Sequence, residues 1–172
     1  FSVTSACSGG PSTTVEGSWR TGCASTDLPY SEGFEGFGTG SGHRPSCWGV
    51  LDANGNYPYL ITTHHNGAAS LYFYSNSSDT ILVATQRLNG NLDDLHIQFW
   101  AYCSNYGKLE VGVMTDTSDL TTFQTLFTLN GNSSTWHEYE LYTDSAASVY
   151  GGFVAFRYTG TSTSSYSCYI DD

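Results

Sequence analysis

Four carboxylates draw attention because they flank one long, charge-poor stretch of the chain. Glu32 and Glu35 lie three residues apart in PYSEGFEGFGTG (29–40), a segment rich in glycine and aromatic residues. Asp171 and Asp172 are the last two residues of the sequence. Carboxylates are ligands of Ca2+, which takes about six to eight oxygens. A pair of carboxylates is also sufficient for the acid–base chemistry of glycoside hydrolysis. The third interpretation is that all four are solvated acids at strand ends.

The spacing favours a cation or solvent over hydrolysis, because neither acidic pair is embedded in a recognisable cleft motif. The first and last strands of a β-sandwich are often neighbours, so the four acids are expected to meet in space. Without a cation, such a cluster repels itself and one member takes up a proton. We therefore predict a structural Ca2+ that ties both ends of the domain together.

Other catalytic motifs are missing from the sequence. Adjacent residues of a strand point to opposite faces, so His64 and His65 in TTHHNG do not readily chelate one ion. The segment GTGSG (38–42) has the wrong spacing for a serine nucleophile elbow and lacks the strand-and-helix setting of a phosphate loop. We expect a protein that is not an enzyme.

The composition describes an acidic and weakly charged chain. Sixteen Asp and Glu against five Lys and Arg give 172 residues a net charge of −11, and charged residues make up only 12%. Such a surface repels nucleic acid and anionic lipid. No apolar run is long enough to span a membrane. Widely scattered cysteines and Ser/Thr-rich segments favour an oxidising, extracellular location.

The elements that must position these residues are short strands. The sequence contains many β-branched or aromatic runs separated by turns of Asn, Gly, Ser and Asp, and no segment keeps helical spacing for three turns. In 95–102, alternation points Leu95, Ile97, Phe99 and Ala101 inward. The chain is predicted to be an all-β, two-layered sandwich or barrel. The expected strands are 71–75, 81–88, 95–102, 108–115, 122–129, 136–143 and 151–160.

The first 27 residues form a separate two-stranded segment and linker in this prediction, and the main domain spans 28–172. Two strands cannot bury a face alone, so they pack on the main domain, belong to a missing neighbour or pair with another chain. Cys7 and Cys23, at the ends of these strands, are candidates for a bridge. Cys103 and Cys168 are the other disulfide candidates, and the connectivity of the five cysteines stays open.

Outward aromatic side chains are the candidate binding feature. Flat rings with polar edges stack on sugars and supply hot spots in protein interfaces. For any single ring, packing within the sandwich is the more frequent role. The predicted ligand-binding residues are Trp100, Tyr102, Tyr72 and Tyr74, within a wider set of candidates that also holds Trp48, Tyr57, Tyr59 and Tyr106.

Short modification motifs also occur. Asn76 and Asn132 each begin an Asn-Ser-Ser acceptor pattern for N-linked glycans. Thr80 and Ser145 follow aspartates in DTI (79–81) and DSA (144–146), which are similar to the O-glycan acceptor sites of Bacteroidota.

Four phrases together resemble one family. LPYSEGFEGFG, LITTHHNGAASLYFYS, LEVGVMTDTSDLTTFQTLFTL and the closing YIDD are similar to cleaved-adhesin and choice-of-anchor domains of Bacteroidota surface proteins, which are akin to the MAM domain. The resemblance covers about residues 28–172. It implies a two-sheet jelly roll with structural calcium held by Glu35 and Asp171, less securely by Glu32 and Asp172, and through main-chain oxygen around Asn66.

The same resemblance bears on both ends of the chain. The first residues resemble the last two strands of a fibronectin type III module. Relatives continue past IDD with a further stretch of strand, so another molecule fills that place here or the edge stays open.

We expect an extracellular or surface-anchored adhesion module that binds a glycan or a surface protein. One alternative is a structural subunit that assembles into homo-oligomers or a fibre through strand edges. The other is an accessory binding module of a secreted hydrolase or protease.

Overall fold

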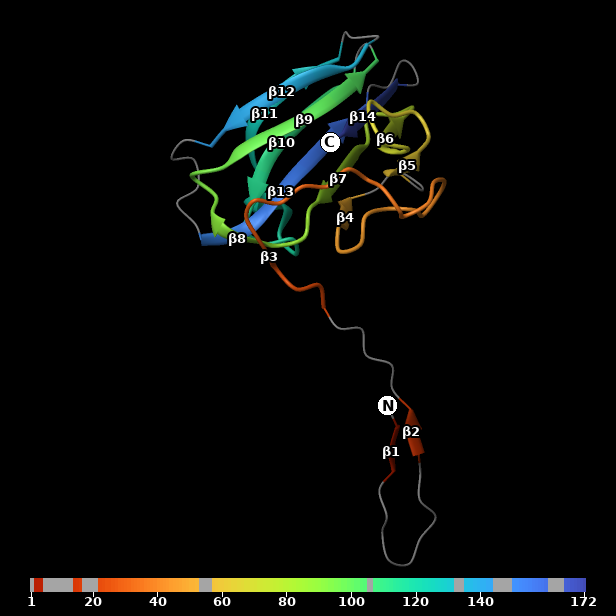
Figure 1. Cartoon of the computed structure of the whole chain (residues 1–172), viewed down its shortest axis with the longest axis vertical. Coiled ribbons are helices and arrows are strands. Elements are labelled where there is room, and N and C mark those ends of the chain that lie inside the picture. The colour runs from red at the N-terminus through yellow and green to blue at the C-terminus, as the bar shows by residue number, and fades with distance from the viewer. Residues whose placement is uncertain are drawn as a thin grey trace, which may run out of the picture.

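The computed structural model describes residues 2–4, 14–16, 22–52, 57–104, 107–131, 135–143, 150–160 and 166–172. Within them the chain forms a five-stranded antiparallel sheet packed face to face on a seven-stranded, mostly antiparallel sheet, a separate two-stranded sheet and one short 3-10 helix, η1 (Leu120–Thr122). The predicted all-β jelly-roll sandwich is confirmed (Figure 1). No helix in this described part is long and apolar enough to cross a membrane.

One layer is a five-stranded sheet with the order β12-β9-β14-β6-β5. β14, the last strand, lies between β9 and β6 and pairs antiparallel with both. The last strand therefore lies inside the sheet rather than at its edge. The bounds are β5 (Tyr59–Ile61), β6 (Ser70–Ser75), β9 (His96–Cys103), β12 (His137–Tyr142) and β14 (Tyr166–Asp171).

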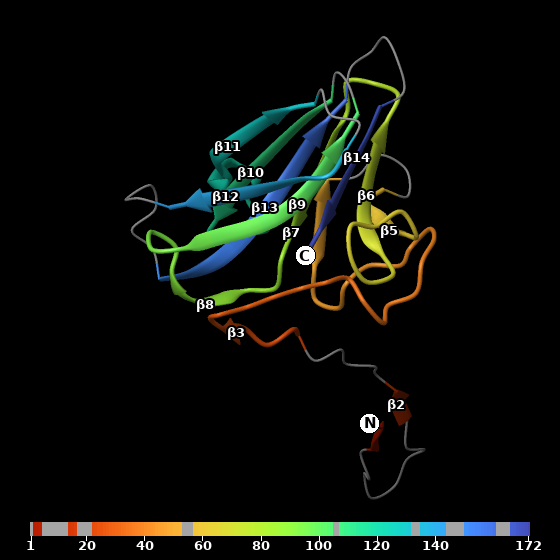
Figure 2. The ribbon, with the colours of Figure 1, turned by 45° about the horizontal axis from the view of Figure 1, so that its top comes forward.

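The other layer is a seven-stranded sheet built on the path β11-β10-β13-β7-β4, with β8 pairing to β13 and β3 pairing to β8 (Figure 2). The predicted strand 81–88 is divided, because its ladder to β13 ends at Ala84 and a second ladder begins at Leu88. The bounds are β3 (Thr26–Asp27), β4 (Gly49–Asp52), β7 (Thr80–Ala84), β8 (Leu88–Asn91), β10 (Lys108–Met114), β11 (Gln124–Asn130) and β13 (Tyr150–Thr159).

The core lies between the two sheets and follows the alternation of the strands. In β9 the even positions are exposed or half-buried, whereas Ile97, Phe99, Ala101 and Cys103 are buried, as the sequence predicts. Phe73 of β6 packs on Tyr158 of β13 across the sandwich, with ring centroids 5.9 Å apart. The two inner faces thus share one apolar interior.

The N-terminal residues contribute to two different sheets. β1 (Ser2–Thr4) and β2 (Thr14–Glu16) pair only with each other, as the predicted two-stranded extension (Figure 1). The predicted linker contains β3, which joins the seven-stranded sheet through a parallel pair with β8. The division of the chain at residue 27 stays a prediction.

Candidate functional site

Four tyrosines stand side by side on the outer face of the five-stranded sheet. Tyr59 pairs in register with Tyr72, Tyr72 with Tyr169, and Tyr169 with Tyr102. The four residues come from β5, β6, β14 and β9, which are consecutive in the sheet. Cross-strand neighbours on one face lie within contact distance. The register therefore builds a continuous aromatic row that runs across the strands.

Alternation explains why these rings face outward. In β6, Leu71 and Phe73 are fully buried while Tyr72 and Tyr74 are half-buried. In β14, Cys168 and Ile170 are buried and Tyr169 is half-buried. Because successive side chains point to opposite faces, the same pattern that fills the core also presents tyrosine on the outside.

The rings pack on one another and leave few gaps. Ring centroids are 5.6 Å apart for Tyr59 and Tyr72, 4.8 Å for Tyr72 and Tyr169, and 5.3 Å for Tyr169 and Tyr102. Trp136 extends the row, 6.0 Å from Tyr102. We call the whole group the aromatic face; its members are Tyr57, Tyr59, His65, Tyr72, Tyr74, Trp100, Tyr102, Trp136 and Tyr169.

A stacked pair closes one corner of the aromatic face. The His65 imidazole lies parallel to the Trp100 indole, with centroids 3.7 Å apart. His65 Nδ1 is 3.0 Å from a carboxylate oxygen of Asp172. The loop that contains His65 is thereby attached to both β9 and the end of β14.

The hydroxyl groups of Tyr57 and Tyr72 on the aromatic face stay protonated in ordinary buffers. Burial raises the pKa of Tyr57 to about 12, and the neighbouring hydroxyls of Tyr59 and Tyr74 add to the effect. Burial and the neighbouring Tyr169 hydroxyl also raise the pKa of Tyr72. The rings therefore offer flat apolar surface and neutral hydrogen-bonding groups, the chemistry that suits an uncharged polyhydroxyl ligand.

The predicted binding residues Trp100, Tyr102, Tyr72 and Tyr74 all belong to this face, and Tyr57 and Tyr59 of the wider set join them. Trp48 does not: it packs between Phe34 and Phe156, and its Nε1 donates to the Tyr30 hydroxyl. Tyr106 lies outside the described residues. Tyr169 and Trp136 were not singled out, although the alternation in SYSCYIDD points Tyr169 outward once Cys168 faces the core.

The other outer face of the sandwich has a different character. On the seven-stranded sheet, Glu110 contacts Arg157 at 2.8 Å and Lys108 at 3.2 Å. Burial raises the pKa of Glu110, but its hydrogen bonds and charge contacts with these two cations outweigh burial and lower it overall. The Arg157 guanidinium also lies 4.3 Å from the centre of the Phe123 ring. The charged groups of this network are paired with one another, so the aromatic face is the better candidate for binding a neutral ligand.

Asp171 holds the loop that follows β5. Its Oδ2 accepts hydrogen bonds from the main-chain N–H groups of His65, at 2.7 Å, and Asn66, at 3.1 Å. The side chain is almost fully buried. Burial raises its pKa, the two N–H donors oppose that shift, and the nearby Asp172 carboxylate reinforces it.

Glu35, which precedes this loop in the sequence, also contacts it. One of its oxygens accepts a hydrogen bond from the main-chain N–H of Ala68 at 2.7 Å. Gly67 has a φ of +69°, and a Cβ at that position would overlap the Glu35 carboxylate. A side chain is therefore excluded at Gly67 by both conformation and space. Glu35 and Asp171 converge on loop 65–68, as the calcium hypothesis requires.

The remaining predicted ligands do not complete a metal site. Glu32 accepts a hydrogen bond from the Phe34 N–H at 2.8 Å, and burial raises its pKa. Among the described residues no three His, Cys, Asp or Glu side chains form a group that could hold a metal ion. Both oxygens of Asp171 and one oxygen of Glu35 already accept N–H donors, so an ion would need main-chain carbonyls for most of its ligands. The calcium hypothesis stays a prediction.

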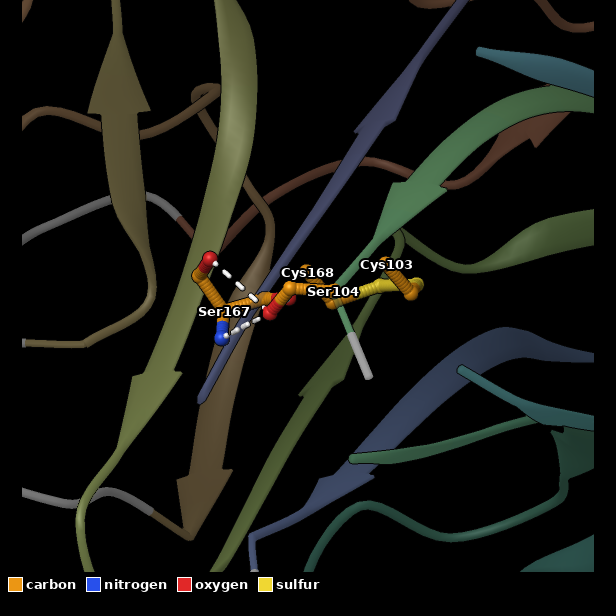
Figure 3. Close-up of a disulfide and its surroundings, with 4 residues drawn as sticks. All are labelled: Cys103, Ser104, Ser167 and Cys168. Atoms are coloured by element: carbon orange, nitrogen blue, oxygen red, sulfur yellow. Dashed lines mark hydrogen bonds between the residues drawn. A yellow bond between two sulfur atoms is a disulfide. The ribbon is translucent and has the colours of Figure 1, made fainter. Parts of the chain in front are cut away.

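Two disulfides are present in the described part of the chain. Cys103 and Cys168 are opposite each other in the β9–β14 ladder and are bonded on the core side of the sheet. Beside them, the Ser104 Oγ donates to the Ser167 carbonyl oxygen and accepts from the Ser167 N–H, each at 3.0 Å (Figure 3). These contacts fasten the end of β9 to β14 directly under the tyrosine row.

The second disulfide corrects the suggested bridge between Cys7 and Cys23. Cys23 is bonded to Cys47, with the two Cα atoms 5.4 Å apart. Cys7 lies outside the described residues. The bridge instead attaches the segment before β3 to the loop before β4.

Two of the four predicted glycan acceptors lie among the described residues. Asn76 is exposed in the turn after β6, and Thr80 is half-buried at the start of β7. Asn132 and Ser145 lie outside the described residues. Their use as acceptors stays a prediction.

Solved structures share the fold of this chain, whereas neither a protein-family model nor a curated protein matches its sequence. The K2 cleaved adhesin domain of Lys-gingipain is 16% identical, with a TM-score of 0.63 and coverage of 83% of this chain and 96% of that one. The K3 cleaved adhesin domain from Porphyromonas gingivalis is 18% identical, with a TM-score of 0.58 and coverage of 74% and 90%. TmCBM61, in complex with β-1,4-galactotriose, is 14% identical, with a TM-score of 0.55 and coverage of 74% and 86%.

At these identities the likeness concerns the fold. The chain has the β-sandwich architecture of cleaved adhesin domains and of a carbohydrate-binding module. The narrower resemblance to choice-of-anchor and MAM-like domains stays a prediction.

Proposed function

We propose that this chain is a non-catalytic extracellular binding module whose aromatic face binds a neutral glycan chain. The observation that carries the proposal is the in-register row Tyr59–Tyr72–Tyr169–Tyr102, which Trp136 extends. Neighbouring strands are about 4.8 Å apart, so the row repeats rings at a spacing close to that of consecutive sugar units. The ligand runs across the strands, with its sugar rings stacked on the aromatic rings.

The charge of the chain narrows the ligand class. At a net charge of −11, the surface repels sulfated and uronic acid-rich glycans. Neutral polysaccharides therefore fit better than acidic ones.

The proposal also includes an extracellular location and a structural Ca2+, and neither depends on glycan binding. The two disulfides suit an oxidising compartment. A structural Ca2+ would lie near loop 65–68, where Glu35 and Asp171 converge. Assembly into a fibre and attachment to a larger hydrolase or protease remain the alternative proposals.

The direct test is a screen of neutral and acidic glycans followed by titration calorimetry on the best ligand. Tyr169→Ala should weaken binding by about tenfold or more, since rings at the centre of a binding surface supply most of its energy, and Trp136→Ala should do the same because tryptophan is prominent among residues that dominate binding. Tyr142→Ala is the matched control, because Tyr142 is 68% exposed on β12 and belongs outside the aromatic face. Equal affinity of all three variants, or preference for acidic glycans, would refute the proposal.

A further inference from the structure

A row of polar residues crosses the outer face of the seven-stranded sheet. Lys108 of β10 pairs in register with Thr159 of β13, and Thr159 pairs with Thr80 of β7. The three side chains are half-buried, on the face opposite the core residues Leu109 and Tyr158. Within the described part of the chain, neither threonine hydroxyl donates or accepts a hydrogen bond. The row therefore offers one ammonium group and two unused hydroxyl groups.

A second row lies beside the first, two residues away along each strand. Glu110 of β10 pairs with Arg157 of β13, and Arg157 pairs with Leu82 of β7. Leu82 is buried and makes the β7 end of this row apolar. The second row thus places a carboxylate, a guanidinium and an apolar side chain next to the ammonium and hydroxyl groups of the first.

The two rows line one pocket of about 300 Å3. Leu120 of η1 also lines it and is 44% exposed, although its side chain is large and apolar. Leu120 and Leu82 give the pocket an apolar side, and the charged and hydroxyl groups give it a polar side. Small-molecule sites combine these features, and this volume is at the lower end of their range. The pocket therefore has room for one ring-sized ligand group.

The pocket carries a net positive charge on an acidic protein. Lys108 and Arg157 are two of the five Lys and Arg residues of the chain, and Glu110 is the one acid among the described residues that line the pocket. Burial opposes the ionised form of Glu110, yet its contacts with Arg157 and Lys108 lower its pKa overall, so it is ionised at neutral pH. Two cations around one carboxylate leave one positive charge unbalanced.

Arg157 is held in position by three contacts. Its Nε donates to Glu110 at 2.8 Å, its Nη2 donates to the Thr125 hydroxyl at 3.3 Å, and its guanidinium carbon lies 4.3 Å from the centre of the Phe123 ring. Its Nη1 makes no hydrogen bond with the residues that the structure describes. A guanidinium that is already fixed, with donors to spare, binds an anion without a large loss of side-chain entropy.

We propose that this pocket binds one sugar residue that carries a single carboxylate, such as a hexuronate. The carboxylate binds to Lys108 and Arg157, which supply the unbalanced positive charge. The ring hydroxyls form hydrogen bonds with Thr80 and Thr159, and the apolar face of the ring contacts Leu82. At a net charge of −11 the protein repels a polyanion, so the ligand carries one negative charge rather than many.

This inference goes beyond glycan binding by the aromatic face and does not depend on it. The two sites lie on the outer faces of different sheets, and no residue of the aromatic face lines the pocket. Tyr169→Ala should therefore leave hexuronate binding unchanged, and Lys108→Gln should leave the binding of a neutral glycan unchanged. Failure of one proposal leaves the other standing.

The test is an NMR titration of the 15N-labelled protein with glucuronate at constant ionic strength. Saturable shifts of the Lys108, Arg157 and Thr159 amides are expected, with none at Tyr142. Glucose has the hydroxyls without the charge, and N-acetylalanine has a peptide-like carboxylate without the hydroxyls. Each should bind about tenfold more weakly or less, since each lacks hydrogen bonds that glucuronate makes. Equal binding of either control compound, or no shift at the three amides, would overturn the proposal.

Variants supply the protein side of the test. Lys108→Gln removes a partly exposed charge, so the fold should persist while the affinity for glucuronate falls by about fivefold or more. Lys108→Arg should recover most of that affinity. Arg87→Gln is the matched control, because it removes the same charge from an exposed residue outside the pocket. Thr159→Val should weaken the binding of glucuronate but not of N-acetylalanine, which gives an answer even if Lys108→Gln does not fold. Unchanged affinity of Lys108→Gln and Thr159→Val, or an equal loss in Arg87→Gln, would refute the proposed site.

Discussion

Tyr72 and Tyr169 face each other across β6 and β14, in register and stacked, with ring centroids 4.8 Å apart and planes 19° from parallel. They lie at the middle of the tyrosine row, so each is supported by another tyrosine on its far side. Such a row is stiff, because moving one ring disturbs two neighbours.

Tyr169→Ala should lower the free energy of unfolding by about 2 kcal/mol, because it removes two stacked contacts and half-buried apolar area. Tyr169→Phe should recover most of that loss. Urea unfolding followed by fluorescence measures both, and Tyr142→Ala should stay within about 0.5 kcal/mol of the wild type. Equal losses for the Phe and Ala variants would show that the hydroxyl, not the ring, carries the stability.

Asp171→Ala should lower the free energy of unfolding by more, about 2–4 kcal/mol. It removes the buried carboxylate that accepts hydrogen bonds from the N–H groups of His65 and Asn66. Asp172→Ala is the neighbouring control, and its exposed carboxylate should matter by less than about 1 kcal/mol. Hydrogen exchange at the His65 and Asn66 amides should quicken in the first variant alone. Unchanged protection of both amides would contradict the assigned role of Asp171.

Asp171 also predicts a pH dependence. Burial raises its pKa in the folded state, so its contribution to stability is complete below the ordinary carboxyl pKa and is lost as the pH rises through the raised value. Asp171→Asn does not titrate. The stability of this variant relative to the wild type should therefore increase as the pH rises from below the ordinary aspartate pKa of about 3.9 through the raised value. Denaturant curves at several pH values measure the difference, and a difference that falls with pH would have the wrong sign.

The calcium hypothesis makes a separate prediction. A calcium concentration 100-fold above the dissociation constant adds about 2.7 kcal/mol to stability, which for this size of chain raises the melting temperature by roughly 5–10 °C. Chelator should remove the increase, and Glu35→Gln should be indifferent to both treatments. If calcium and chelator leave the wild-type melting curve where it is, the N–H donors of loop 65–68 alone hold the two carboxylates.

Local patterning of the sequence was sufficient to predict the layers of the fold. The alternation in 95–102 assigns the buried and outward residues of β9 correctly, since one face of that strand is core. It did not predict the break after Ala84, where Gln86 is half-buried and Arg87 is exposed before a second ladder to β13 begins at Leu88.

The candidate site was harder to predict because it depends on register. Trp100, Tyr102, Tyr72 and Tyr74 are recognisable as outward rings from their own strands, but their arrangement as a row requires the pairing of β6, β14 and β9. Tyr169 and Trp136 become part of it only through those pairings. Similarly, the partners of Asp171 are main-chain N–H groups more than 100 residues away, which no side-chain motif reveals.

The Cys103–Cys168 bond has a mechanical consequence for the five-stranded sheet. A force that pulls β14 from its Asp171 end loads the ladder to β9 one residue pair at a time. Peeling can release Asp171, Ile170 and Tyr169 from that ladder, but it stops at Cys168, where a covalent bond joins the two strands. Beyond Cys168 the disulfide, rather than the hydrogen bonds, bears the force between β14 and β9. We expect only the short stretch from Tyr169 to Asp171 to separate from β9.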